Sequence, residues 1–150
     1  MSRKQELVAE LVWQVRRSFR ELAAAADRRL APLGIAGSER ALMEFLARAE
    51  GPVSLSEVAR QQSVSKQHVH QSLQRLNADW VEREPDPADA RSVLVRLSRG
   101  GRALWNRVRA TDEQFAGELA PHFTEQELRL AVDVLRRLRE RLAEEADDAG

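Results

Sequence analysis

The sequence predicts a mainly α-helical fold with a small β-hairpin wing. Two observations carry this prediction. Residues 54–102 contain, in order, a capped short helix, a turn, a second helix and a hairpin with a polar tip. Long amphipathic segments also occupy both ends of the chain. Together they indicate a winged helix-turn-helix with additional N- and C-terminal helices, an arrangement that suits DNA binding.

The first helix of the motif is expected to begin after Ser54. The Ser54 hydroxyl can cap free N–H groups at the helix N-terminus, and Glu57, three residues on, can reach back to the cap. A short helix to about Gln62 would bury Leu55, Val58 and Ala59. Residues 63–65 then interrupt the helical pattern with two serines around one apolar anchor. Ser65, the last of them, is placed to cap the next helix.

The second helix is expected to run from Lys66 to about Ala78. Its apolar residues recur at spacings of four and three, so they form one stripe toward a core: Val69, Leu73 and Leu76. The opposite face then carries Lys66, Gln67, His70, Gln71 and Gln74. No carboxylate lies on this face, which suits phosphate. Glutamine amides can pair with adenine edges, and lysine or histidine can donate to guanine. The alternative is an ordinary solvated polar face.

A β-hairpin follows the second helix. Residues 80–84 are a strand candidate, residues 85–90 form a turn cluster, and residues 92–97 alternate as a second strand. The second strand places three apolar residues on one face: Val93, Val95 and Leu97. Arg91 lies near the tip of this hairpin. Ser98 is then expected to cap a further helix to about Ala120, with two glycines in its first turn.

Composition limits the class of protein. A chain of 150 residues with 43% hydrophobic content fits one domain. The absence of cysteine excludes disulfides and thiol-based switching. Because no apolar run resembles a signal peptide or approaches the length of about 20 residues that a membrane span needs, we expect a cytoplasmic protein without a membrane role.

The net charge of zero conceals an uneven distribution. Residues 57–109 contain ten basic and six acidic side chains, a net charge of +4. Residues 110–150 contain five basic and eleven acidic side chains, a net charge of −6. The positive charge therefore coincides with the helix-turn-helix and the hairpin, where phosphate contacts would supply affinity for DNA.

The two ends of the chain predict long helices with apolar seams. Near the N-terminus the seam comprises Val8, Leu11, Val12, Val15, Phe19, Leu22 and Ala26, and it ends before Pro32. At the other end, residues 124–127 form a capping box before a seam of Leu128, Ala131, Leu135, Leu138 and Leu142. These helices either pack on each other within one subunit or interlock with those of a second copy.

The segment from Asp86 to Gly101 resembles the wing signature of the MarR family of bacterial transcriptional regulators, with two Asp and one Arg shaping the wing and a Leu-Ser and a Gly closing it. The match in layout extends over nearly the whole chain. The chain departs from the family pattern at Gln62, Ser63, Asp79 and Ala90.

The resemblance implies one domain over residues 1–150, in which residues 36–109 are the DNA-binding lobe and residues 1–32 and 110–150 are dimerisation helices. The dimer contacts are expected from Val8, Leu11, Val12, Val15, Leu128, Leu135, Leu138 and Leu142. A homodimer would set two recognition helices roughly 34 Å apart, so the target would be an inverted repeat in double-stranded DNA.

The recognition helix supplies most of the expected DNA contacts. Three side chains are expected to reach base edges in the major groove: Gln67, His70 and Gln71. Lys66 would contact a base or a phosphate, and Ser65 and Arg75 would hold backbone phosphates.

The wing is expected to place Arg91 in the minor groove, where a narrow A·T-rich groove has an enhanced negative potential. Asp89 would orient Arg91 or shape the turn. The alternative for Arg91 is an ordinary salt bridge with Asp86 or Asp89, and the two interpretations can coexist.

No pattern indicates catalysis, a metal or a cofactor. His68 and His70 are two apart and so point to different sides of a helix, and His122 is remote. The resemblance implies a repressor released by a small, often aromatic or phenolic, effector. The residues that could line its cleft, or simply form core, are Trp13, Phe19, Phe45 and Trp105. The alternative function is a winged-helix adaptor that binds a protein partner instead of DNA.

Overall fold

The computed structural model describes residues 1–148 and divides into two compact units. The first unit comprises residues 1–111, and the second begins at Asp112. The elements of the first unit are α1 (Arg3–Leu30), η1 (Ala31–Leu33), α2 (Gly37–Arg48), β1 (Val53–Ser54), α3 (Leu55–Gln62), α4 (Lys66–Arg75), η2 (Ala78–Trp80), β2 (Val81–Asp86) and β3 (Asp89–Leu97). Helix α5 (Arg99–Leu119) crosses the boundary, and η3 (Ala120–His122) and α6 (Glu125–Asp148) follow. This mainly helical architecture with one small sheet confirms the predicted fold class.

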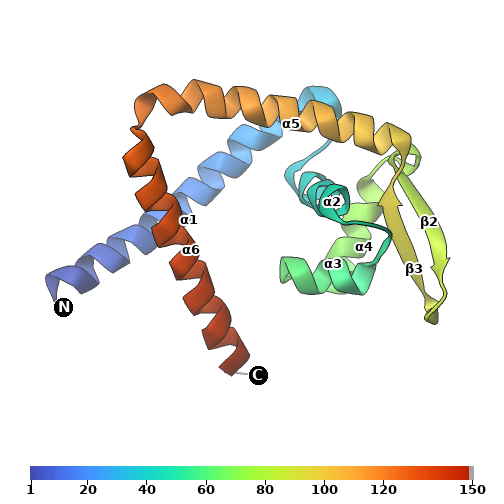
Figure 1. The fold of residues 1–150 in the computed structure, drawn as a ribbon, viewed down its shortest axis with the longest axis horizontal. Helices are drawn as coiled ribbons and strands as arrows, with labels where there is room; N and C mark the ends of the chain where they lie inside the picture. Colours follow the sequence, from blue (N-terminus) through green and yellow to red (C-terminus); the bar gives the residue numbers. More distant parts are fainter. Residues whose placement is uncertain (149–150) are drawn as a thin grey trace. The chain divides into compact units, whose positions relative to one another are not determined.

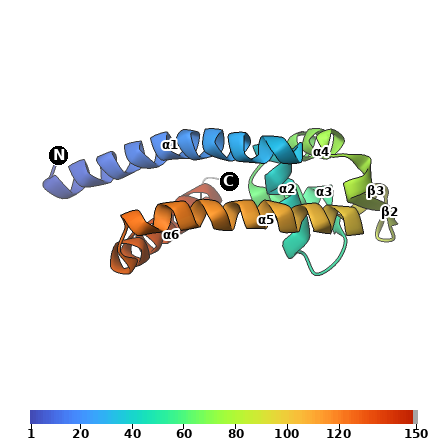
Figure 2. The same cartoon turned by 90° about the horizontal axis from the view of Figure 1, so that it is seen from above.

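Helix α1 is the long N-terminal helix that the periodicity predicts. It begins with a capping box between Ser2 and Gln5, and it ends at the buried Leu30, before Pro32 as expected. Figure 2 shows α1 as one continuous helix whose C-terminal end lies near α2. Asp27 Oδ1 accepts a hydrogen bond of 2.9 Å from the backbone N–H of Gly37. The last turn of α1 therefore caps the first turn of α2.

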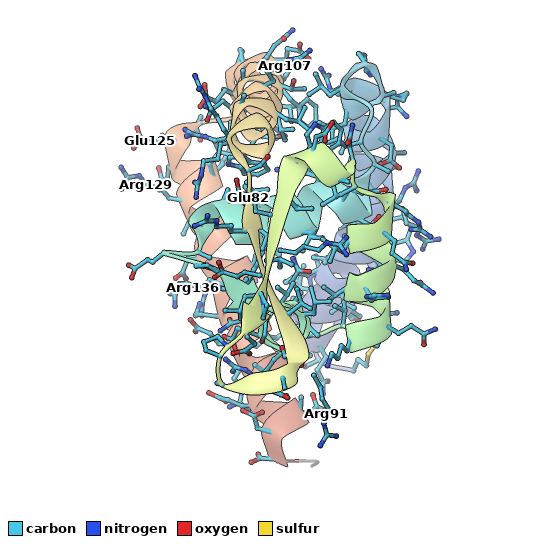
Figure 3. The ribbon with its side chains drawn as sticks, turned by 90° about the vertical axis from the view of Figure 1, so that its right-hand side faces the viewer. Glu82, Arg91, Arg107, Glu125, Arg129 and Arg136 are labelled. Carbon is cyan, nitrogen blue, oxygen red and sulfur yellow. The ribbon has the colours of Figure 1, made fainter. Side chains whose placement is uncertain are left out.

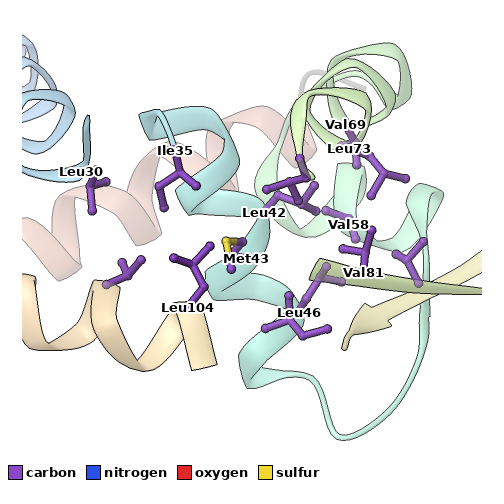
Figure 4. Close-up of a cluster of buried hydrophobic side chains, with 14 of the residues drawn as sticks. Leu30, Ile35, Leu42, Met43, Leu46, Val58, Val69, Leu73, Val81 and Leu104 are labelled. Atoms are coloured by element: carbon purple, nitrogen blue, oxygen red, sulfur yellow. The ribbon is translucent and has the colours of Figure 1, made fainter. Parts of the chain in front are cut away.

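One apolar core fills the first unit (Figure 4). Helix α2 lies at its centre, and Met43 is completely buried. Helices α3 and α4, the sheet and the start of α5 contribute from around it. The buried members include Leu30, Leu42, Leu46, Val58, Val69, Leu73, Leu76, Val95, Leu97, Leu104 and Val108. The predicted core stripe of the second motif helix is thereby confirmed.

Helix α3 begins and ends where the sequence predicts, but only half of its expected capping box forms. Ser54 Oγ accepts from the backbone N–H of Glu57 at 3.1 Å. The Glu57 carboxylate does not reach back to the cap, as predicted, but accepts hydrogen bonds from Gln61 and Arg60 in the next turn. These hydrogen bonds, that from Gln61 above all, lower the pKa of the Glu57 carboxyl.

The turn between α3 and α4 depends on a left-handed residue that is not glycine. Ser63 has φ 53°, and the backbone N–H of Val64 donates to the carbonyl of Ala59 at 3.1 Å, which closes the end of α3. Gln62 Nε2 donates to the carbonyl of Ala41 at 2.9 Å and so fastens the turn to α2. The prediction of Val64 as an apolar anchor is wrong, because its side chain is exposed.

Helix α4 ends at Arg75, three residues earlier than predicted. The backbone of Leu76 is extended at φ −65° and ψ 140°, which directs its side chain into the core while the chain leaves the helix. Asn77 Oδ1 then accepts from the backbone N–H of Asp79 at 3.0 Å and starts the turn η2. Asparagine competes with helix continuation by such local side-chain bonds.

The three strands form an antiparallel sheet in the order β1-β3-β2. The hairpin strands extend further than predicted, so that only Pro87 and Ala88 remain in the turn. Along β3, Val95 and Leu97 are buried as expected, whereas Val93 is 42% exposed because it lies nearer the tip, beyond the core.

Gly101 allows α5 to start directly against the hairpin. A Cβ atom at this position would lie 2.0 Å from the carbonyl oxygen of Trp80, which is a backbone atom. Ser98 organises the same junction: its hydroxyl accepts from the N–H of Gly101 at 3.0 Å and donates to the carbonyl of Asp79 at 2.5 Å. The predicted cap of α5 by Ser98 is confirmed.

The second unit contains the end of α5 and the helix α6. Thr124 and Glu127 form the reciprocal capping box that the sequence predicts, with hydrogen bonds of 2.8 Å and 3.2 Å. The backbone N–H and the hydroxyl of Thr124 lower the pKa of the Glu127 carboxyl. No side chain of α6 is fully buried, although its apolar seam is present.

We expect Gly101→Ala to lower the free energy of unfolding by at least about 2 kcal/mol, because the new methyl group must displace the Trp80 backbone. Gly100→Ala is the matched control, since its Cβ would lie 3.5 Å from the nearest atom, an ordinary contact. That change should be neutral or stabilise by up to about 1 kcal/mol. Urea denaturation of both variants measures the difference, and equal stability would contradict the steric role.

Candidate nucleic-acid interface

Helix α4 is capped by a side chain at its start, which fixes how its N-terminal turn is presented. At its start, Ser65 Oγ accepts from the backbone N–H of His68 at 3.0 Å, as the sequence predicts. The Ser65 hydroxyl can still donate its proton to an external acceptor. The N-terminal turn of α4 also carries free backbone N–H groups and the positive end of the helix dipole, both of which suit phosphate.

The polar face of α4 is fully available. Its members are exposed, whereas Val69, Ser72 and Leu73 are buried behind them. Within residues 1–148, the side chains of Gln67 and Gln71 make no hydrogen bond to another residue. Their amides can therefore hydrogen-bond to the donors and acceptors of a base edge without breaking a hydrogen bond inside the protein.

His70 and Gln74 differ from the other residues of this face because they contact each other. Gln74 Nε2 lies 3.2 Å from His70 Nε2, one turn along the helix. The sequence predicts both residues on this face but a DNA contact for His70 alone. The spacing of four residues was the signal that could have linked them.

The hairpin tip is shaped by two aspartates. Asp86 Oδ1 accepts from the backbone N–H of Ala88, and Asp89 Oδ1 accepts from the backbone N–H of Arg91, both at 2.9 Å. Such aspartate turns stabilise tight backbone reversals. Of the two roles expected for Asp89, this contact supports the shaping of the turn.

Arg91 extends from the end of the hairpin (Figure 3). Its side chain is exposed, and no carboxylate within the described residues lies within salt-bridge distance of its guanidinium. The alternative of an ion pair with Asp86 or Asp89 is therefore not what the structure holds. Arg96, on the same strand, is paired instead, at 2.7 Å from Glu82. Arg75, at the end of α4, is also exposed, and it forms no ion pair within the described residues.

The two groups of predicted DNA contacts lie in the same unit. Figures 1 and 3 show α4 next to the β2–β3 hairpin. Residues 65–75 come from the helix, and Asp89 and Arg91 come from the hairpin. The structure thus presents a helix face without carboxylates together with a hairpin tip from which Arg91 extends. This pair of elements can contact two neighbouring grooves of a duplex.

The aromatic residues proposed for an effector cleft separate into two pairs. Phe45 and Trp105 are half-buried and pack against the core of the first unit. Trp13 and Phe19 are exposed on α1, where Trp13 lies against Arg17 with 5.3 Å between the guanidinium carbon and the ring centroid. Because Phe45 and Trp105 pack against the core, the structure supports a structural role for these two residues. Effector binding by any of the four aromatic residues stays a prediction.

The residues proposed for dimerisation keep apolar surface accessible. Half or more of the surface of Val8 and Leu142 is exposed, and Leu128 and Leu135 are also exposed. Partial burial is found for Leu11, Val12, Val15 and Leu138.

The capped α3, the left-handed turn, the exposed α4 and the hairpin define a winged helix-turn-helix protein. Within residues 1–148, no group of three or more histidine and acidic side chains could hold a metal ion. In the same range, no helix is long and apolar enough to cross a membrane.

Known proteins share both the sequence pattern and the fold. The model of the MarR family matches residues 33–92. The HTH-type transcriptional regulator YdgJ of Bacillus subtilis (strain 168) is 31% identical over 107 residues, which is 71% of this chain and 65% of that protein. The match thus spans less than two thirds of the length of this relative.

Solved structures of the family superimpose over most of the chain. A crystal structure of a MarR family transcription regulator has a TM-score of 0.84 at 23% identity, covering 96% of this chain and 95% of that chain. A mutant MarR from E. coli, complexed with operator DNA, has a TM-score of 0.76 at 24% identity, covering 92% and 99%. These structures share the fold.

The chain is similar to the MarR family over residues 33–92 and shares the fold of solved family structures. The resemblance found in the segment from Asp86 to Gly101 is confirmed by the family match, which includes the first part of that segment.

We expect Arg91→Ala to weaken DNA binding about tenfold or more without unfolding the protein, because the side chain has no partner within residues 1–148. The slope of log K against log salt should fall by about two for a dimer that loses one contact in each half. Fluorescence anisotropy at several salt concentrations measures both quantities.

Arg96→Ala is the matched control, because it removes the same charge from the same strand but from a side chain paired with Glu82. Its effect on DNA affinity should be clearly smaller. Equal weakening by the two variants would assign the effect to overall charge and reject a specific role for the wing tip.

Proposed function

We propose that the protein is a transcriptional regulator that binds an inverted-repeat operator as a homodimer. The observation that carries this proposal is the exposed polar face of α4, which has no carboxylate and whose Gln67 and Gln71 amides are unpaired within residues 1–148. A face that served only solubility would gain from internal Glu–Lys pairs, which are absent here. The solved complex of the E. coli relative with operator DNA supports the same interpretation.

In this proposal α4 is the recognition helix, and it and the wing contact different grooves of the DNA. Gln67, His70 and Gln71 read base edges in the major groove, and Lys66 contacts a base or a phosphate. Ser65 and Arg75 hold backbone phosphates from the two ends of the helix.

The wing adds a contact in the adjacent minor groove. Arg91 enters it with a side chain that no internal ion pair restrains within the described residues. Asp89 contributes by fixing the backbone at Arg91 through the 2.9 Å hydrogen bond. The chain would thus read both sequence and groove shape.

The homodimer rests on the apolar surface that the terminal helices leave exposed. Residues 1–32 and 110–150 would supply the dimerisation helices, and residues 36–109 the DNA-binding lobe. Contiguous apolar faces of this kind are uncommon on isolated soluble chains, and a second copy of the same helices is the partner whose surface matches in character and length. Two-fold symmetry then requires an inverted repeat.

The regulatory outcome follows from family resemblance. We infer repression, with release by a small aromatic or phenolic effector that contacts some of Trp13, Phe19, Phe45 and Trp105. We also infer a cytoplasmic location, because the operator of a bacterial regulator lies on chromosomal DNA in that compartment.

Selection of bound sequences from a random DNA pool tests the proposal directly. The purified protein should enrich an inverted repeat with half-sites about one helical turn apart. A salt titration on the selected site should then give a steep loss of affinity. With Lys66, Arg75 and Arg91 in each half, about six phosphate neutralisations predict a slope near −5 for log K against log salt.

The opposite result would favour a winged-helix adaptor. A protein that enriches no sequence and binds DNA weakly, with little response to salt, would use the glutamine-rich face of α4 for a protein partner. A largely apolar protein contact depends little on salt, so the titration separates the two functions.

Leu135→Glu should convert the dimer to a monomer and weaken operator binding strongly. The substitution places a charge in the apolar seam of α6, where burial against a partner would be unfavourable. Sedimentation equilibrium measures the mass. Because Leu135 is 44% exposed within the chain and lies outside the core of the first unit, the substitution should leave the fold of the DNA-binding lobe intact.

Gln126→Glu serves as the control, since it adds the same carboxylate to the polar side of the same helix. This variant should remain dimeric. A Leu135→Glu protein that stays dimeric at micromolar concentration would exclude this seam from the interface.

A further inference from the structure

A hydrogen bond on α4 links two side chains that the proposed function treats separately. Gln74 Nε2 lies 3.2 Å from His70 Nε2, and the two residues are one helical turn apart. Both side chains are exposed on the face of α4 assigned to DNA. The proposed function gives His70 a base contact but gives Gln74 no role.

The chemistry of the two groups determines where the imidazole carries its proton. The amide nitrogen of a glutamine can only donate a hydrogen bond, so the ring nitrogen that faces it must accept one. A neutral imidazole has one donor and one acceptor nitrogen. With Nε2 of His70 accepting from Gln74, the proton lies on Nδ1, and Nδ1 is the donor that remains for an outside partner.

No carboxylate on the same helix competes for the His70 ring. Helix α4 contains no acidic residue between Lys66 and Arg75. The other polar side chains of the face, Gln67 and Gln71, make no hydrogen bond within residues 1–148. The His70 ring is therefore oriented by Gln74 alone among the side-chain contacts of α4.

A fixed donor reads fewer base edges than a free imidazole does. A histidine without a partner can present either an N–H or a lone pair, because the proton can occupy either nitrogen. A ring held as a donor pairs only with acceptors. In the major groove, guanine presents two acceptors, N7 and O6, and no donor. Adenine sets an amino donor beside its one acceptor, thymine presents a single acceptor, and cytosine presents only an amino donor.

We propose that Gln74 is a specificity-determining residue that holds His70 as an N–H donor and so directs one position of each half-site toward guanine. Gln74 acts through His70 as a positioning residue. The inference rests on the proposed DNA-binding function, but its first step, the protonation of the ring, is a property of the free protein.

Nitrogen NMR of the histidine ring in the free protein tests the first step. Spectra are recorded in basic buffer, so that the two neutral forms of the ring are compared. His70 is assigned with a His70→Gln variant. We expect the proton on Nδ1 in the unmodified protein and a shift toward the Nε2-protonated form in Gln74→Leu and in Gln74→Ala.

Gln114→Leu is the matched control, because it removes another exposed amide hydrogen bond between residues four apart, that of Gln114 to Glu118 at 3.3 Å on α5. It should leave the His70 signals unchanged. A ring protonated on Nε2 in the unmodified protein, or identical His70 spectra in Gln74→Leu, would overturn the proposal.

Selection from a random DNA pool tests the second step. We expect a preference for guanine of about tenfold at one position of each half-site, falling to about twofold or less at that same position in both His70→Ala and Gln74→Leu. Loss of preference at a different position in Gln74→Leu would show that Gln74 reads a base itself. An unchanged selection with DNA still bound would also reject the proposal.

Failure of the proposed function can be told apart from failure of this inference. If the unmodified protein enriches no sequence, DNA recognition fails and the guanine bias fails with it. The ring spectra would then still report whether Gln74 sets the proton of His70. If an operator is enriched but lacks a guanine preference that responds to both variants, only the role of Gln74 is rejected.

Discussion

The structure depends on the two faces of α4: one face packs in the apolar core, and the opposite, polar face is exposed to solvent. Val69 and Leu73 are each only 2% exposed, and burial of two such side chains stabilises the unit by several kcal/mol, about 1.5–3 kcal/mol each. This packing holds the helix without using any polar side chain of the opposite face. The stability of the lobe and the chemistry of its surface are therefore supplied by different residues of the same ten-residue helix.

Close backbone packing at the base of the hairpin positions the wing, so a sheet of three strands is enough to hold it. Strand β3 lies between β1 and β2, and Val95 of β3 is completely buried. At the base of the hairpin, Gly101 lets the first turn of α5 approach the carbonyl of Trp80 at a distance that no larger residue permits. The tip is then free to carry Arg91 outward, because the register is already fixed at the other end of the strands.

Periodicity and capping made most of the fold predictable, and the errors have local causes. The stripe through Val69, Leu73 and Leu76 and the caps at Ser54, Ser65 and Ser98 follow from sequence rules and are present in the structure. The sequence predicts an end of α4 near Ala78, but Asn77 starts a turn of its own and the helix ends at Arg75. The Glu57 carboxylate has several partners within reach, and sequence alone does not rank them.

The terminal helices differ from the lobe in how their stability must arise. The core of the first unit is closed by α2 to α5 and the last turn of α1, and the exposed seam residues of α1 and α6 add nothing to it. Most helical stability in proteins comes from tertiary packing of an amphipathic face and not from intrinsic propensity. In the proposed homodimer, the order of α1 and α6 would therefore depend on protein concentration, whereas the order of the helix-turn-helix would not. The fold of the DNA-binding lobe and the association of two copies would then rest on different apolar surfaces of one chain.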